Sequence, residues 1–181
     1  MLKPAQPPRA AAGFTIIELM TAVAILSILL VLGVPSMRGV VENTRIRTAT
    51  ESYSYGLAVA RNDAVRLNAQ VEFVMDATGW QVRPVADPGG VLHRGTGKEG
   101  TARLTITVTP NGTDRITYNS FGTSLATNPS DNSAPLTEIL FESLSPPGVS
   151  GYRPLRLQLR AGGLARACDP AVGSTDPRAC L

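Results

Sequence analysis

The chain has 181 residues and a formal net charge of +3, which suits one compact domain plus one special segment. A charge this small does not mark a nucleic-acid-binding protein by itself. Hydrophobic residues make up 43% of the composition, but many of them lie in one N-terminal run. Beyond Pro35 the sequence is polar and rich in Thr, Gly and Pro, which favours a soluble, loop-rich β domain over a membrane bundle.

The N-terminal part divides into a polar leader, residues 1–13, and a long apolar run. From Phe14 to Val34 only Glu18 is ionisable, and a helix of that length reaches about 30 Å, enough to cross a bilayer core. Positive charges precede the run, which predicts a cytoplasmic N-terminus and an external remainder. A secretory signal has a shorter apolar core with a cleavage site after it. A plain membrane anchor leaves Glu18 unexplained, because a charge near the bilayer centre costs about 2.5–3.5 kcal/mol.

The stretch "GFTIIELM" resembles the processing site of type IV prepilins and pseudopilins. The resemblance implies cleavage after Gly13 by a prepilin peptidase and N-methylation of the new N-terminal residue, Phe14. It places Glu18 at the position of the family's glutamate and Pro35 where many pilins carry a proline that kinks or loosens the helix.

Elementary electrostatics gives Glu18 a use in assembly. Cleavage creates an α-amine that is cationic near neutrality, since its ordinary pKa is about 7.7–8.0. A buried carboxylate without a partner is costly, so packing subunits until each Glu18 meets an amine favours a filament.

After Pro35 the pattern remains helical. An amphipathic helix is expected over residues 36–68, continuous with the apolar run and bent or locally unwound near Pro35. Its apolar stripe consists of Ile46, Ala49, Tyr53, Leu57, Ala60, Ala64 and Leu67. The opposite face carries Arg45, Glu51, Arg61, Asp63 and Arg66.

Short strands are expected in the remainder, residues 69–181, arranged as two small antiparallel sheets packed together. Three turns separate three pairs of candidate strands. These pairs are "VEFVMD" with "WQVRPV", "RLTITV" with "DRITY" across an Asn-Gly turn, and "TEILFESL" with "YRPLRLQLR". Residues 87–100 and 123–135 are expected to be exposed loops.

Two cysteines, Cys168 and Cys180, lie close together near the C-terminus. In an exported domain a disulfide is their natural use, whereas in a reducing compartment they would be free thiols. Two cysteines alone do not make a zinc site, which needs about four ligands.

The C-terminal segment "LRLQLRAGGLARACDPAVGSTDPRACL" resembles the end of minor pilins of the GspH/FimT type, which includes FimT and FimU. Such proteins finish with a basic Gly-Arg-x-Arg segment, Cys-Asp-Pro and Asp-Pro-Arg-x-Cys. Some FimT proteins bind DNA through the basic segment. Here the second motif arginine matches Arg166, but the first falls on Leu164, so half of the motif is missing. The candidate phosphate-contacting residues are Arg156, Arg160, Arg166 and Arg178, with Arg153 nearby as a further one.

Together these observations predict an α+β, pilin-like fold: a long N-terminal α-helix, transmembrane over residues 14–35, packed on a small antiparallel β-sandwich head with a C-terminal disulfide loop. The leader is expected to be cytoplasmic and cleaved, and the head periplasmic. The expected function is that of a minor pilin aiding assembly of a type IV pilus. The alternatives are a pilus-borne DNA receptor for natural transformation and a minor pseudopilin of type II secretion.

The expected partners are other pilins, prepilin peptidase, the inner-membrane assembly platform and, under the receptor alternative, DNA. The sequence contains no nucleophile elbow, phosphate loop or paired-histidine motif. We therefore expect no enzymatic activity, no cofactor and no metal site.

Overall fold

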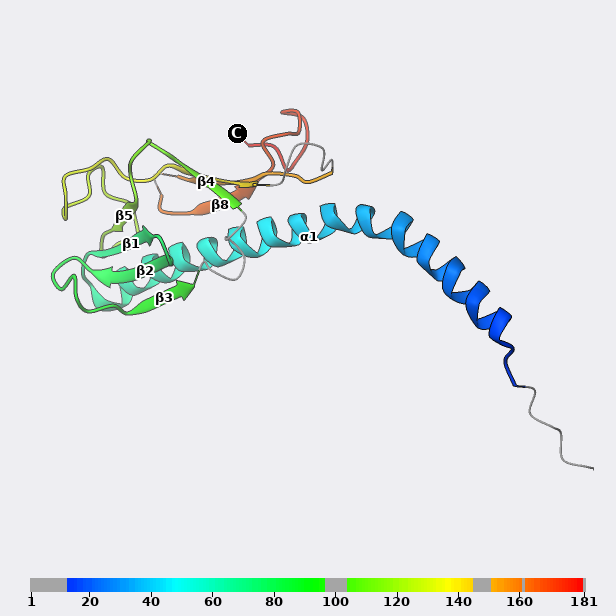
Figure 1. Cartoon of the computed structure of the whole chain (residues 1–181). Coiled ribbons are helices and arrows are strands. Elements are labelled where there is room, and N and C mark those ends of the chain that lie inside the picture. The colour runs from blue at the N-terminus through cyan, green and yellow to red at the C-terminus, as the bar shows by residue number, and fades with distance from the viewer. Residues whose placement is uncertain (1–12, 97–103, 145–150, 161, 181) are drawn as a thin grey trace, which may run out of the picture. The chain divides into compact units, whose positions relative to one another are not determined.

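The computed structural model describes residues 13–96, 104–144, 151–160 and 162–180, with only the backbone of 31–38 and 96. One helix, α1 (Ile16–Leu67), is followed by eight short strands (Figure 1). The chain divides into two compact units, Met1–Arg38 and Gly39–Leu181, and α1 contributes to both. The C-terminal half of the helix therefore belongs to the same unit as the strands.

The strands form two four-stranded antiparallel sheets, as the sequence predicts. Sheet A has the order β3-β2-β1-β5 and contains β1 (Val71–Asp76), β2 (Gly79–Pro84), β3 (His93–Thr96) and β5 (Arg115–Tyr118). Sheet B has the order β4-β6-β7-β8 and contains β4 (Leu104–Thr109), β6 (Glu138–Ser143), β7 (Leu155–Leu159) and β8 (Ala165–Cys168). The expected β1–β2 hairpin and the β6–β7 pair are both present.

The expected pairing of β4 with β5 is wrong. The chain does turn after β4, where the N–H of Thr113 donates to the carbonyl of Pro110 and Gly112 has a φ of +84°. The two strands then enter different sheets: β4 pairs with β6, and β5 pairs with β1. Burial explains the difference, because Ile116 and Tyr118 of β5 are packed in the core beside β1.

A strand was also not expected at β3, which lies inside the loop predicted over residues 87–100. Residue 95 of β3 is a glycine because the strand approaches Trp80 closely there. A Cβ at this position would overlap the indole ring. The glycine therefore marks a close contact between β2 and β3 and not a turn.

The helix from Gly39 onward buries the predicted stripe, with two departures. Ile46, Ala49, Tyr53, Leu57, Ala60 and Ala64 are all buried. Leu67, at the last turn, is 40% exposed. Asp63 was assigned to the polar face but is buried, because the helix turns it toward sheet A, where the Nε2 of His93 lies 3.0 Å from its Oδ2.

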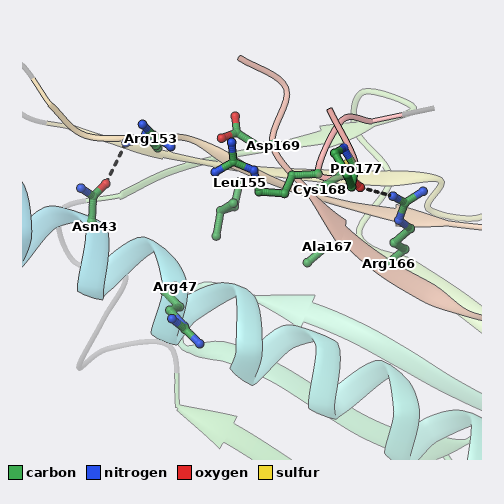
Figure 2. A pocket seen from close by; sticks show the side chains of 10 residues that line it. Asn43, Arg47, Arg153, Leu155, Arg166, Ala167, Cys168, Asp169 and Pro177 are labelled. Carbon is green, nitrogen blue, oxygen red and sulfur yellow. Dashed lines mark hydrogen bonds between the residues drawn. The ribbon is translucent and has the colours of Figure 1, made fainter. Parts of the chain in front are cut away.

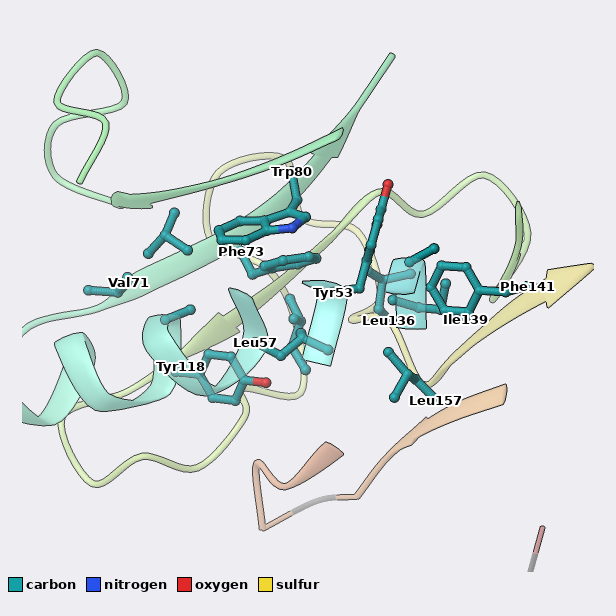
Figure 3. Close-up of a cluster of buried hydrophobic side chains, with 14 of the residues drawn as sticks. Tyr53, Leu57, Val71, Phe73, Trp80, Tyr118, Leu136, Ile139, Phe141 and Leu157 are labelled. Carbon is teal, nitrogen blue, oxygen red and sulfur yellow. The ribbon is translucent and has the colours of Figure 1, made fainter. Parts of the chain in front are cut away.

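One core joins this part of the helix to both sheets (Figure 3). Tyr53 lies between them, with its ring edge-on to Phe73 of sheet A at 6.2 Å and to Phe141 of sheet B at 5.2 Å between centroids. Its hydroxyl donates to the carbonyl of Gly79 at 3.4 Å. Edge-to-face pairs of this kind add about 0.5–1.5 kcal/mol each beyond their buried area. Tyr53 therefore contacts both sheets from the helix.

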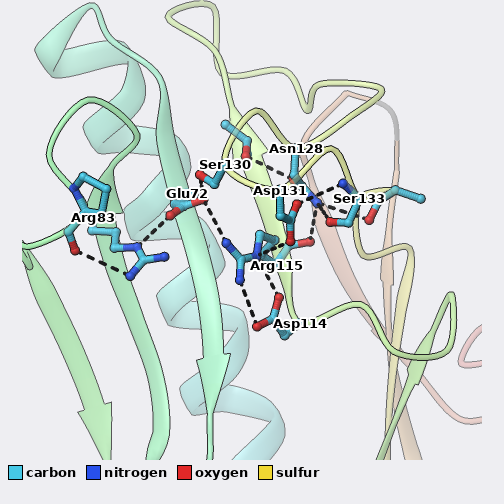
Figure 4. A network of polar contacts seen from close by, with 11 residues as sticks. Glu72, Arg83, Asp114, Arg115, Asn128, Ser130, Asp131 and Ser133 are labelled. Atoms are coloured by element: carbon cyan, nitrogen blue, oxygen red, sulfur yellow. Dashed lines mark hydrogen bonds and ion pairs between the residues drawn. The ribbon is translucent and has the colours of Figure 1, made fainter.

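The loop expected over residues 123–135 is anchored to sheet A by a buried carboxylate, Glu72 of β1 (Figure 4). Glu72 has 0% exposure, and its two oxygens accept hydrogen bonds from the Nε of Arg83 at 2.6 Å and the hydroxyl of Ser130 at 2.7 Å. Asn128 is also fully buried and donates to the carbonyl of Ala134. Buried polar groups satisfied in this way hold an irregular segment in one conformation.

Candidate functional site

The first candidate site is the start of α1. Thr15 precedes the helix, and its hydroxyl oxygen accepts a hydrogen bond from the N–H of Glu18 at 3.2 Å. The spacing Thr-x-x-Glu is that of a capping box, and a carboxylate in the first turn is favoured by the helix dipole. Glu18 therefore stabilises the start of the helix, in addition to the role in assembly that is predicted for it. This local role was not among the predictions from the sequence.

Gly13, at the predicted cleavage position, has no packing role. A Cβ added there would meet no atom of the described residues within 4 Å. Phe14 is 86% exposed. The fold therefore supplies no reason for a glycine at this position.

The first part of α1, from Ile16 to Leu30, carries large apolar side chains on every side. Between Ile16 and Leu30 the large hydrophobic side chains are each more than half exposed: Ile16, Ile17, Leu19, Met20, Val23, Ile25, Leu26, Ile28, Leu29 and Leu30. A soluble monomer rarely presents so much continuous apolar surface, which marks a surface that other molecules cover. Among the side chains that the structure describes, no helix has the length and hydropathy of a membrane span.

Helical structure continues through Pro35 without interruption, so local unwinding is not observed there. A bend of the axis at Pro35 stays a prediction.

The second candidate site is the C-terminal tail, where Cys168 and Cys180 form the disulfide. Cys168 ends β8, a strand that was not expected, and is buried. The tail returns so that Asp169 and Ala179 form a parallel bridge, with the N–H of Asp169 donating to the carbonyl of Arg178 at 2.8 Å. The disulfide and this bridge give a fixed shape to a segment rich in Pro and Gly.

Beside the tail lies a pocket of about 430 Å³, here called the arginine pocket (Figure 2). Its wall is made by the helix, the start of β7, the end of β8 and the tail. The lining residues are Asn43, Arg47, Arg153, Leu155, Arg166, Ala167, Cys168, Asp169, Pro177 and Arg178. The side-chain oxygen of Asn43 accepts from the backbone N–H of Arg153 at 2.8 Å, and its amide donates to the carbonyl of Gly151 at 2.9 Å. Asn43 thereby joins the helix to the segment that leads into β7.

Two of the four arginines in the pocket are already paired. The Nε of Arg47 lies 2.8 Å from the Oε1 of Glu51, and the Nη2 of Arg178 lies 2.7 Å from the Oδ2 of Asp176. Hydrogen bonds from the Arg178 side chain and backbone lower the pKa of Asp176 to about 2, with a smaller contribution from the charge of Arg153. This carboxyl group is therefore ionised throughout the physiological range.

The other two arginines form no close ion pair with a described residue. In the described part of the chain, no carboxylate lies within 4 Å of the guanidinium of Arg153 or of Arg166. Arg166 donates from Nη2 to the carbonyl of Pro177 at 3.0 Å, which fixes its position against the tail.

The structure brings together only part of the predicted basic set. Arg166 and Arg178 both line the pocket, but Arg156 lies 3.3 Å from Glu138 and Arg160 is exposed outside the pocket. Arg47 is the residue that the sequence analysis missed. Arg47 is far in sequence from the C-terminal arginines, so no local pattern indicates that it lines the same pocket.

The turn between β7 and β8 contains the start of the half-matched basic motif. Gly163 has a φ of +79°, and a Cβ there would overlap the carbonyl oxygen of Gly122. That oxygen also accepts a hydrogen bond from the Nε of Arg61 of the helix at 2.8 Å. Leu164 is 60% exposed. The glycine is required by packing, whereas the leucine in place of an arginine faces solvent.

Sequence comparisons match most of the chain. Residues 8–34 match the prokaryotic N-terminal methylation motif, and residues 49–163 match the family described as type II transport protein GspH. No curated protein sequence matches the chain.

Among solved structures, the fold is similar to two crystal forms of the type IV minor pilin FimU from Pseudomonas aeruginosa. The first is 17% identical, with a TM-score of 0.53 over 77% of this chain and 98% of that chain. The second is 16% identical, with a TM-score of 0.50 over 75% of this chain and 99% of that chain. At these identities the likeness establishes a shared pilin-like fold.

Proposed function

The chain belongs to the family of type II transport protein GspH, a family of pilin-like structural subunits and not of enzymes, and we propose that it acts as a minor pilin of a type IV pilus. In this role it enters the growing fibre and aids the start of assembly. Before assembly it is anchored in the bacterial inner membrane by residues 14–35, with its head in the periplasm.

The observation that carries this proposal is the apolar surface at the start of α1. A helix exposed on all sides with large hydrophobic side chains needs a bilayer or a bundle of like helices around it. The methylation motif over residues 8–34 supports processing by a prepilin peptidase after Gly13 and methylation of Phe14. The disulfide between Cys168 and Cys180 fits a head that folds in an oxidising compartment.

A second candidate is a minor pseudopilin of a type II secretion system, which the description of the matching family favours. The two candidates differ in what is lost when the gene is deleted. A pilus subunit predicts loss of piliation or twitching with secretion intact. A pseudopilin predicts the reverse.

The assembly proposal is tested by changing Glu18 in the full-length chain in its host. Glu18→Gln removes the charge but keeps a side chain that serves a capping box, so helix capping is preserved. We expect this variant to reach the membrane and to be lost from sheared fibres, because the amine of the neighbouring subunit would have no counter-charge at residue 18. Glu142→Ala, which removes a carboxylate from the head, is the matched control and should be incorporated like the wild type. Normal incorporation of Glu18→Gln would refute the charge-based role.

A further inference from the structure

No described residue of the N-terminal apolar run lines the arginine pocket. The pocket is built wholly within the unit Gly39–Leu181, from residues distant in sequence: Arg47 on the helix, Arg153 before β7, Arg166 on β8 and Arg178 in the tail. The hydrogen bonds of Asn43 and the disulfide hold these segments together. The pocket is therefore preformed and does not need a ligand to gather its arginines.

Among the described residues, the charge at the pocket is nearly balanced. Asp169 lines the pocket, and Glu51 and Asp176 are ion-paired with Arg47 and Arg178, so the four arginines and these three carboxylates sum to +1. The excess lies at Arg153 and Arg166, the two arginines that form no ion pair within 4 Å in the described part of the chain. One added carboxylate neutralises this excess, and the planar guanidinium groups can each bind a carboxylate through paired N–H donors.

Apolar groups form the rest of the wall. Leu155, Ala167 and Pro177 line the pocket together with Arg153 and Arg166. Such a wall suits the methylene groups of an acidic side chain and the peptide backbone beside it.

From this charge complementarity we propose that the arginine pocket binds one carboxylate side chain of a neighbouring pilin subunit. The proposal rests on the proposed function, since it supposes a pilin partner. It adds a second, head-to-head contact to the one made by Glu18.

A nucleic acid fits the same pocket less well. Duplex DNA carries about one charge per 1.7 Å of its axis, so a bound strand would place further phosphates beside Glu51, Asp169 and Asp176. The remaining predicted basic residues do not extend the pocket into a track, because Arg156 is paired with Glu138 and Arg160 lies outside. A single carboxylate meets no such repulsion.

The test uses photo-crosslinking in the host with the full-length chain. The photoreactive residue p-benzoylphenylalanine is placed at Thr48, which is exposed and adjacent to Arg47 but does not line the pocket. We expect a crosslink to another pilin, mapped by mass spectrometry to a segment containing Asp or Glu. The double variant Arg153→Gln/Arg166→Gln should lower its yield by about tenfold or more, because each bond to a charged partner contributes that order of affinity.

Arg160→Gln is the matched control, since it removes the same charge from an exposed arginine outside the pocket. Its crosslink yield should equal that of the wild type. A crosslink that persists in the double variant, falls equally in the control, or maps to a protein other than a pilin would overturn the proposal. Non-reducing electrophoresis checks that each variant retains its disulfide and hence its folded tail.

Two further measurements separate the alternatives. Binding of a short DNA duplex by the purified full-length chain, weakened by Arg166→Gln and not by Arg160→Gln, would assign the pocket to phosphate and overturn the carboxylate assignment. Incorporation into sheared fibres is scored in parallel. If the wild type is absent from fibres, the proposed function fails; if it is present while the crosslink is insensitive to Arg153 and Arg166, only the pocket assignment fails.

Discussion

Replacing Cys168 and Cys180 together by alanine should destabilise the head by an amount that can be worked out from the chain. The two cysteines are 12 residues apart in sequence, so the disulfide closes a loop of about 13 residues. In the chain-entropy model such a loop restricts the unfolded state by about 3 kcal/mol at 25 °C. With an m-value of about 2 kcal/mol per M in urea, the unfolding midpoint should fall by about 1.5 M.

Fluorescence of Trp80 is a suitable probe of this change. Trp80 is the one tryptophan of the chain, is buried in the core and stacks on Phe73 at 5.7 Å. Wild-type protein reduced with dithiothreitol is the control, because it loses the same loop closure without any change of side chain. It should unfold at the midpoint of the double variant, and dithiothreitol should not affect the variant further. An unchanged midpoint in the double variant would show that the tail unfolds independently of the core, and the loop-closure reasoning would be wrong.

Two other predictions concern the core. Gly56→Ala should destabilise the head by about 1–3 kcal/mol, because a Cβ there would lie 2.7 Å from Phe73 and Trp80. In an exposed helix the same change is favourable by about 1 kcal/mol, so a stabilised variant in urea titrations would contradict this packing. Alkali should also destabilise the head, because burial raises the pKa of Tyr53 from 10.0 to about 12. The folded state then binds more protons than the unfolded state, so stability falls between about pH 10 and pH 12; in Tyr53→Phe, circular dichroism should show a weaker fall over this interval.

The elements that the sequence predicted are those specified by local patterns. The buried stripe of the helix follows from its three- and four-residue spacing, and the β1–β2 hairpin follows from a turn between two alternating runs. The exposed apolar run with Glu18 could also be predicted, because it is a short-range feature of composition. The same holds for the two cysteines, which lie close together in sequence.

The features that were missed depend on contacts between distant residues. The Asn111-Gly112 turn is local and present, but the sheet that each flanking strand joins is decided by packing against β1 and β6. Glu72 is fully buried although carboxylates are seldom found in cores, because Arg83 and Ser130 lie where they can bond it. The arginine pocket was predicted only in part for the same reason. Arg47 is distant in sequence from Arg153 and Arg166, and only the folded chain places them around one pocket.

At the β7–β8 turn, one residue determines the path of the backbone and the next residue determines the side chain that is presented to solvent. Only glycine fits at residue 163, because a Cβ there would overlap its surroundings, above all the carbonyl oxygen of Gly122. Leu164, next to it, is directed outward and is not constrained by that contact. Related subunits can therefore exchange leucine, arginine or another side chain at residue 164, and so alter what the head attracts, while the turn that displays it keeps the same path.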